Sequence, residues 1–97
     1  LTVYGALKAG LGQFTRFLGK ELGPQGIQVL GVNAGSMWGP GRPLTDDSPA
    51  TLYPRGRTAI QRYELPEEVA NMVAFLASDA ASAMNGAMID MGGGMAV

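Results

Sequence analysis

Tyr4 and Lys8 are the two side chains whose types and spacing suggest acid/base chemistry. Residues four apart on an α-helix project from the same side, one turn from each other. A phenol normally titrates near pH 10, which is too high for efficient proton exchange at neutral pH, and a nearby ammonium favours the ionised phenol. We therefore predict an acid/base pair in which Lys8 tunes Tyr4. The alternative is an aromatic residue and a lysine on the flank of an amphipathic helix, and spacing alone favours that alternative.

The helix that carries this pair is predicted to run from about residue 3 to residue 22. Its apolar positions recur at helical spacing and form one stripe, which consists of Leu7, Leu11, Phe14, Leu18 and Leu22. Gly23 and Pro24 then end the helix, because proline cannot continue it. Another face carries Gly5, Ala9 and Gly12, so a second backbone can approach closely there. That backbone belongs either to another helix or to the chain's own sheet, and the sequence favours neither.

The composition excludes several classes of protein. The 97 residues suit one small domain, and 46% of them are hydrophobic, which is typical of a globular chain. The 7 basic and 8 acidic residues give a net charge of −1, so we expect neither nucleic acid nor a membrane surface as a partner. No apolar run approaches the roughly 18 residues of a membrane-spanning helix. The chain has no cysteine and no histidine, so we predict no metal site, and a reducing cytoplasm is the default location.

A strand is predicted after the first helix. Residues 27–32 are short, β-branched and mostly apolar, a pattern typical of a strand that is buried on both faces in a parallel sheet. Gly35 lies just past the carboxyl end of this strand, where open α/β sheets bind ligands. An ordinary turn glycine is the alternative.

Residues 36–64 are predicted to be a long irregular segment, within which residues 41–63 form a flap over the substrate. The segment is partly aromatic and locally basic, with Trp38, Tyr53, Arg55, Arg57, Arg62 and Tyr63. A solvated loop is the alternative for any of these arginines taken singly.

The last third of the chain is predicted to contain a helix and a strand. The helix begins at Pro66, with acidic residues in its first turn, and ends at Ser78 and Asp79. Asp79 is predicted to cap a short helical turn, and Asn85 with Gly86 marks a turn before a strand at residues 87–91.

The order helix, strand, flap, helix, strand predicts the back half of a doubly wound α/β domain. In this order the chain resembles the C-terminal part of the short-chain dehydrogenase/reductase family. The resemblance fails only in the flap, and it rests on YGALKAGL (4–11), ELGPQGIQV (21–29), LPEEVA (65–70), FLASDAAS (75–82) and residues 85–94. It implies that residues 1–97 are the C-terminal part of a single NAD(P)-binding Rossmann-type domain, with two strands, two main helices and a long flap, whose N-terminal half is absent.

The resemblance also implies a reaction, a cofactor and a set of site residues. A hydride would move between NAD or NADP and the carbonyl or alcohol carbon of a small molecule. Tyr4 matches the family's tyrosine that protonates the developing alkoxide, and Lys8 matches the lysine that tunes this tyrosine and binds the nicotinamide ribose. Ala34, Gly35 and Met37 match the stretch whose backbone meets the carboxamide end of the cofactor. A homodimer or homotetramer is implied for the parent enzyme.

The chain departs from the family pattern at several positions. Ala34 stands where the family usually has proline, Gly39 replaces a threonine that commonly contacts the carboxamide, and Leu30 and Gly92 replace an asparagine and an aspartate. The family's glycine-rich phosphate loop, ribose selector and catalytic serine all precede the tyrosine, and here only three residues precede Tyr4. We therefore expect a fragment that is inactive alone. The alternatives are a truncated remnant that serves only in assembly or dimerisation and a helical interaction module without redox chemistry.

Overall fold

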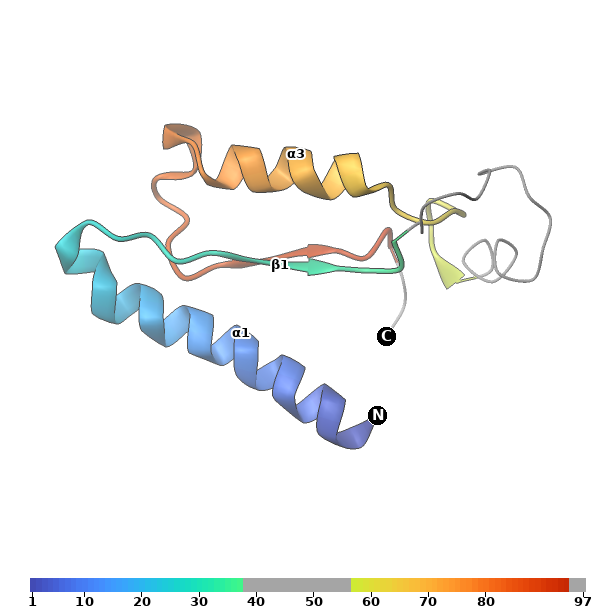
Figure 1. The fold of residues 1–97 in the computed structure, drawn as a ribbon, viewed down its shortest axis with the longest axis horizontal. Helices are drawn as coiled ribbons and strands as arrows, with labels where there is room; N and C mark the ends of the chain where they lie inside the picture. Colours follow the sequence, from blue (N-terminus) through green and yellow to red (C-terminus); the bar gives the residue numbers. More distant parts are fainter. Residues whose placement is uncertain (38–56, 95–97) are drawn as a thin grey trace. The chain divides into compact units, whose positions relative to one another are not determined.

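The computed structural model describes residues 1–37 and 57–94 of the chain. Figure 1 shows two main helices and a pair of strands. In chain order the elements are α1 (Thr2–Leu22), η1 (Gly23–Gln25), β1 (Gly31–Ala34), α3 (Pro66–Leu76), η2 (Asp79–Ala81) and β2 (Met88–Met91). This order confirms the predicted α/β fold class.

The chain divides into two compact units. Unit 1 comprises Leu1–Val32 and Val73–Ile89, and unit 2 comprises Asn33–Met72 and Asp90–Val97. Both strands pass from the first unit into the second, so each unit contains one end of the sheet.

The end of α1 is set by glycine and proline, as the sequence predicts. The helix stops at Leu22, and Pro24 lies in the first turn of the short 3-10 helix η1 that follows. Gly26 closes this turn in the left-handed conformation with a φ of 78°, and its N–H donates to the carbonyl of Gly23 at 2.9 Å. A residue with a side chain rarely adopts this conformation, which explains why glycine stands there.

The packed side of α1 consists of small residues. Thr15 and Gly19 are buried, and the Thr15 hydroxyl donates to the carbonyl of Leu11 at 2.9 Å. A Cβ added to Gly12 would lie 3.7 Å from the Met88 side chain, whereas a Cβ added to Gly5 would meet nothing within 4 Å. Of the two interpretations of this glycine face, packing on the chain's own sheet is therefore correct at Gly12.

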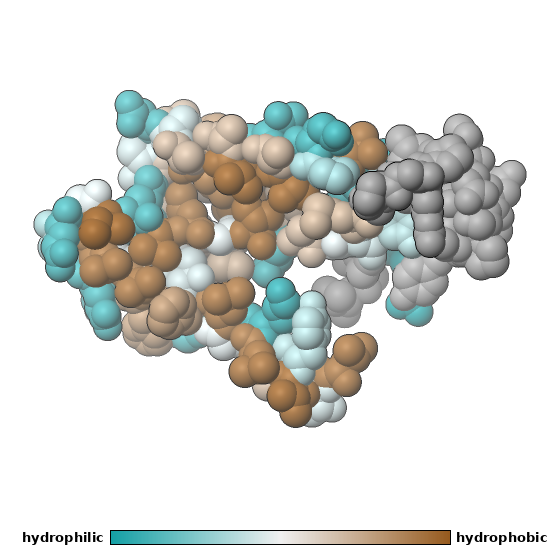
Figure 2. Space-filling model, viewed as in Figure 1, coloured by the Kyte–Doolittle hydropathy of each residue, from teal (hydrophilic) through white to brown (hydrophobic). Residues whose placement is uncertain are grey.

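The apolar stripe of α1 is exposed at its first three residues, whereas Leu18 and Leu22 are half-buried. Leu7, Leu11 and Phe14 are 70%, 50% and 59% exposed. Figure 2 shows apolar side chains at the surface along this helix. The strands lie against the small residues because a backbone can approach them closely, and the described residues supply no second surface for the leucines.

The strands β1 and β2 pair in parallel. The N–H of Gly31 donates to the carbonyl of Ala87 at 3.0 Å, and the N–H of Gly35 donates to the carbonyl of Met91 at 3.2 Å. Both strands advance by four residues in the same direction between these two bonds, as parallel pairing requires. The observed β2 lies within the predicted 87–91.

The predicted strand at residues 27–32 requires two corrections. β1 begins at Gly31, because Val29 lies beside a turn and not beside a strand: its carbonyl accepts from the N–H of Gly86 and its N–H donates to Asn85 Oδ1, each at 2.8 Å. The segment is also not buried on both faces, since Ile27 is 46% exposed and Val32 only half-buried. Within the described residues, β1 has a strand on one side only.

The second main helix, α3, begins at Pro66 as predicted and ends at Leu76, which is buried. The short turn η2 follows, but Asp79 is its first residue and not its cap. Ser78 precedes the turn and makes no side-chain capping bond to it, because its hydroxyl donates back to the carbonyl of Phe75 at 2.6 Å. The side chain of Gln28 donates to the carbonyl of the buried Ala81 and so joins this turn to the segment before β1.

The irregular segment is bracketed by Met37 and Glu64, which form an isolated parallel bridge. Most of the predicted flap at 41–63 lies outside the described residues, as do Trp38, Gly39, Tyr53 and Arg55.

Candidate active site

Tyr4 and Lys8 lie on the first turns of α1, and the structure brings them together as their spacing predicts. The Nζ atom of Lys8 lies over the ring of Tyr4, 5.6 Å from the ring centroid. A cation at this distance from an aromatic face is attracted by the ring's electron-rich surface. Tyr4 is 59% exposed, so its phenol is open to a reacting partner.

Ala34 and Gly35 come together in unit 2 at the carboxyl end of β1. The N–H of Gly35 is shared between the carbonyl of Met91 at 3.2 Å and Glu64 Oε2 at 3.1 Å. A Cβ at position 35 would lie only 3.0 Å from the Cα of Gly92, which is closer than side chains normally approach a backbone. Glycine is therefore required at position 35 by close packing.

A pocket of about 510 Å³ lies beside this turn. Its lining is mostly backbone and glycine, from Asn33, Ala34, Gly35, Asp90, Gly92, Gly93 and Gly94. The side-chain amide of Asn33 donates to Asp90 Oδ1 at 2.9 Å. Gly93 and Gly94 have φ values of 63° and 77°, conformations that favour glycine. Met37, the third residue predicted to meet the cofactor, is 47% exposed and does not belong to this lining.

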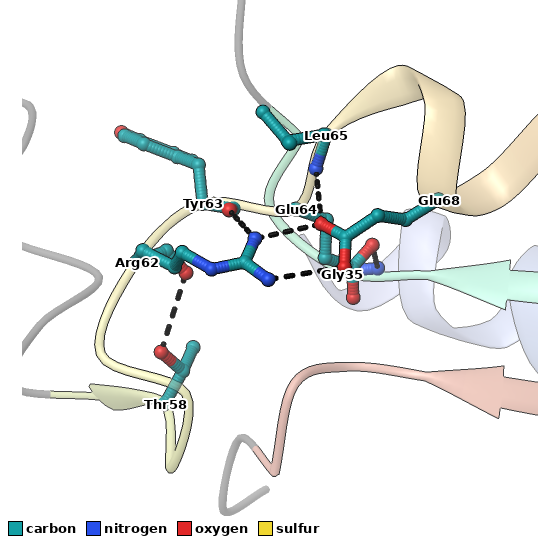
Figure 3. A network of polar contacts seen from close by, with 7 residues as sticks. All are labelled: Gly35, Thr58, Arg62, Tyr63, Glu64, Leu65 and Glu68. Atoms are coloured by element: carbon teal, nitrogen blue, oxygen red, sulfur yellow. Dashed lines mark hydrogen bonds and ion pairs between the residues drawn. The ribbon is translucent and has the colours of Figure 1, made fainter. Parts of the chain in front are cut away.

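A polar network holds the segment that precedes α3 (Figure 3). Arg62 donates from Nη1 to Glu68 Oε1 at 2.6 Å and from Nη2 to Glu68 Oε2 at 3.0 Å. Glu68 Oε1 also accepts from the N–H of Leu65 at 2.9 Å, which is one half of a helix capping box. The hydrogen bonds from Arg62, and next the one from Leu65, lower the pKa of the Glu68 carboxyl to about 2. The bond to Glu68 in turn raises the pKa of Arg62.

Arg62, one of the arginines of the predicted irregular segment, belongs to this network, and its side chain is 42% exposed. Its guanidinium is held by Glu68 and by the carbonyl of Tyr63 at 3.0 Å. Neither contact of Glu68 was predicted. A glutamate at the third position of a helix is half of the capping-box pattern and could have indicated the bond to Leu65, but nothing in the pattern indicates the pairing with Arg62. Glu64, a buried glutamate that contacts Gly35, was not predicted either, and the sequence offers no signal for it.

Within residues 1–37 and 57–94, no three potential metal-ligating side chains are grouped together. No helix of these residues combines the length and the apolar character needed to cross a membrane.

The comparisons with known proteins cover almost the whole chain. A family model described as enoyl-(acyl carrier protein) reductase matches residues 1–96. The oxidoreductase YjdA of Bacillus subtilis is 39% identical over 94 residues, which cover 94% of this chain and 35% of that protein. The 3-oxoacyl-(acyl-carrier-protein) reductase FabG of Pseudomonas aeruginosa is 39% identical over 96 residues, which cover 97% of this chain and 38% of that protein.

The chain belongs to the short-chain dehydrogenase/reductase family. Solved structures agree with this assignment. BdcA in complex with NADPH is 35% identical with a TM-score of 0.83, and the match covers all of this chain and 39% of that one. A short-chain dehydrogenase of Burkholderia cenocepacia in complex with NADP is 34% identical with a TM-score of 0.79, covering 96% of this chain and 37% of that one. This member of the family therefore spans less than two fifths of the length of these relatives and structures, and the resemblance to a C-terminal part is confirmed.

Proposed function

We propose that the chain is the C-terminal part of an NAD(P)-dependent oxidoreductase that interconverts an alcohol and a carbonyl in a small molecule. In this proposal the chain supplies the acid/base pair Tyr4 and Lys8 and one wall of the cofactor site, and it is inactive alone. The observation that carries the proposal is the pair itself: a tyrosine and a lysine one helical turn apart, with the ammonium over the ring, in a chain of this family.

The proton transfer follows from the position of the phenol. Tyr4 donates its proton to the oxygen of the substrate as the carbonyl becomes an alcohol, and it accepts that proton in the reverse direction. In the proposal Lys8 is the partner of Tyr4 in this step, with its ammonium held over the ring 5.6 Å from the centroid. The nicotinamide cofactor supplies or accepts the hydride. The exposure of Tyr4 leaves its hydroxyl within reach of a substrate.

The turn after β1 fits one end of such a cofactor. At Gly35 a side chain would collide with Gly92, so the segment presents backbone groups and not side chains. The adjoining pocket of about 510 Å³ lies in the size range of ligand pockets and is lined largely by glycine. In the proposal Ala34, Gly35 and Met37 meet the carboxamide end of NAD or NADP through their backbones, and Tyr4 and Lys8 contact the ribose.

A second candidate function rests on a different observation. The exposed face formed by Leu7, Leu11 and Phe14 on α1 suits a remnant that acts only in assembly. The enzyme proposal also predicts that this face is covered, by the N-terminal half or by another subunit of a homodimer or homotetramer. Both candidates therefore predict association, and only the enzyme predicts catalysis. We propose the enzyme, and we propose the cytoplasm as its location.

The test uses the longer protein that contains this chain. Tyr4→Phe deletes only the hydroxyl, so turnover should fall by at least about a hundredfold while cofactor affinity changes little. Lys20→Ala changes an exposed lysine in the last turn of the same helix, to which the proposal gives no role, and should leave turnover within about twofold. Lys8→Ala should reduce both turnover and cofactor affinity.

Steady-state kinetics and cofactor fluorescence titration measure these effects. A Tyr4→Phe enzyme with near-normal turnover would remove the assignment of Tyr4 as acid/base. A longer protein with intact folding but no oxidoreductase activity on any carbonyl or alcohol would favour the assembly role.

A further inference from the structure

Glu64 is the one buried charged residue among the residues that the structure describes. Its residue is only 5% exposed, and its Oε1 atom has no hydrogen-bond partner among the described residues. A carboxylate in such a place loses solvation that one hydrogen bond does not restore. Natural chains retain groups of this kind where the group performs a task, so its contacts are informative.

Three consecutive residues of the turn after β1 contact Glu64, and they do so in three different ways. Glu64 Oε2 accepts from the N–H of Gly35 at 3.1 Å. The N–H of Glu64 donates to the carbonyl of Ser36 at 2.9 Å. Met37 and Glu64 form the parallel bridge. The turn therefore contacts Glu64 through both the backbone and the side chain of that residue, and Figure 3 shows the side-chain contact at Gly35.

The segment that carries Glu64 is itself fixed. Arg62 and Leu65, on either side of Glu64 in the sequence, are both hydrogen-bonded to Glu68 in the first turn of α3. Gln61 has a φ of 58°, a conformation that is uncommon outside glycine, and its N–H donates to the carbonyl of Thr58 at 3.1 Å. Local strain of this kind persists where surrounding contacts determine the conformation. Glu64 thus connects the turn after β1 to the start of α3.

We infer that Glu64 is a positioning residue, which holds the backbone of residues 35–37 in the conformation that receives the nicotinamide end of the cofactor. The inference rests on the proposed function and deepens it. The side-chain bond to Gly35 is the part that this residue type supplies, since the backbone contacts at Ser36 and Met37 are open to other residues. Loss of the carboxylate should therefore weaken binding of the nicotinamide end and leave binding of the adenosine end unchanged.

The test compares two ligands in the longer protein. The dinucleotide, NADH or NADPH, reaches the turn, whereas ADP-ribose or its 2′-phosphate lacks the nicotinamide. Glu64→Met keeps the length of the side chain but removes the acceptor, and an apolar group is tolerated at a buried position. It should weaken dinucleotide binding on the order of tenfold, the equivalent of one hydrogen bond, and change ADP-ribose binding by less than about twofold.

Matched variants separate positioning from general stability. Glu64→Gln retains an acceptor for the N–H of Gly35 and should restore dinucleotide affinity. Glu67→Gln changes an exposed glutamate in the first turn of α3 and should bind both ligands as the wild type does. In Gly35→Ala the added Cβ would lie 3.0 Å from the Cα of Gly92 and 3.1 Å from Glu64 Oε1, so this variant disturbs the turn itself and should also lose dinucleotide affinity selectively.

The outcomes are distinguishable. Equal weakening of both ligands in Glu64→Met, wild-type dinucleotide affinity in that variant, or a glutamine variant as weak as the methionine variant would each overturn the role of Glu64. If Glu64→Met does not fold, Glu64→Leu, which also removes the acceptor, takes its place, and equal loss of both ligands there overturns the inference. A wild-type protein that binds no reduced nicotinamide cofactor would overturn the proposed function instead.

Discussion

The two ends of α1 differ in how the chain supports them. The C-terminal half is packed: Thr15 and Gly19 are buried, and Asn85 donates to the carbonyl of Gly19 at 2.7 Å. The N-terminal half carries Tyr4 and Lys8, and its residues from Leu1 to Leu11 are all exposed. The end of the helix that bears the candidate chemistry is thus the end that the described chain does not itself stabilise.

The difference shows how the site depends on the rest of an enzyme. A helix with exposed apolar residues on its first turns gains little from its own propensity, because most helical stability in proteins comes from packing. The turn after β1, by contrast, is held by contacts within unit 2, including those with Glu64. This chain therefore stabilises the turn after β1 by its own contacts, whereas it does not pack the end of α1 that carries Tyr4 and Lys8.

The largest effect that we expect is loss of function when the 97-residue chain is studied by itself. It should bind no reduced nicotinamide cofactor and should self-associate or remain loosely packed. Two strands are too few for an independent sheet, and their open edges together with Leu7, Leu11 and Phe14 favour association. Sedimentation with a cofactor fluorescence titration measures both properties. A sharp monomer with a cooperative melt and saturable binding would instead show that the chain is a complete domain.

The next effect concerns Asn85, which joins the packed end of α1 to the strands. Its Nδ2 donates to the carbonyl of Gly19, and its Oδ1 accepts from the N–H of Val29 at 2.8 Å. Asn85→Ala in the longer protein should lower the free energy of unfolding by about 1–3 kcal/mol, because it removes two backbone contacts at once and one of them, the bond to Gly19, is partly buried. Asn33→Ala, which removes an exposed bond to Asp90, serves as the control and should cost less than about 0.5 kcal/mol. Chemical denaturation measures the free energy of unfolding of both variants. An equal loss in the two would contradict the conclusion that Asn85 stabilises the packed end of α1.

A pair of glycine substitutions compares the two ends of α1 with the same chemical change. Gly86 contacts the packed end near Arg16 and has a φ of 82°, so Gly86→Ala should destabilise the longer protein by about 1–2 kcal/mol. A Cβ on Gly10 would meet nothing within 4 Å, so Gly10→Ala should stabilise it by up to about 1 kcal/mol through helix propensity. Thermal unfolding provides the measurement. A loss of stability in Gly10→Ala would mean that another segment or subunit lies against that glycine.

The smallest effect is an acid transition at the start of α3. The pKa of Glu68 is lowered from 4.5 to about 2, so its ion pair with Arg62 stabilises the folded state above pH 4.5. This contribution is lost as the pH falls from 4.5 towards about 2, because the carboxyl becomes protonated in that window. The amide NMR signal of Leu65, which donates to Glu68, should follow that titration. Glu68→Gln should remove it, and a midpoint near 4.5 in the wild type would contradict the ion pair.

Much of the fold could be predicted from local signals. Gly23 and Pro24 end α1 and Pro66 begins α3, because these residues act on the backbone next to them. The pairing of Tyr4 with Lys8 follows from helical geometry. The start of β1 could not be predicted in this way, since it depends on which distant residues lie opposite Val29, and these are the turn residues Asn85 and Gly86. The same reason applies to Glu64, whose partner lies 29 residues away.

The sequence by itself determined the fold class, the family resemblance and the residues that carry the proposed chemistry, because each depends on residue types at fixed short spacings. Only the tertiary structure decided which face of α1 is packed. The strands lie against Gly12 and Thr15, and the turn at Asn85 and Gly86 lies against Gly19, where the absence of bulky side chains lets the backbones approach. Whether two backbones can approach each other closely depends on both segments, so the sequence pattern of one segment does not predict it.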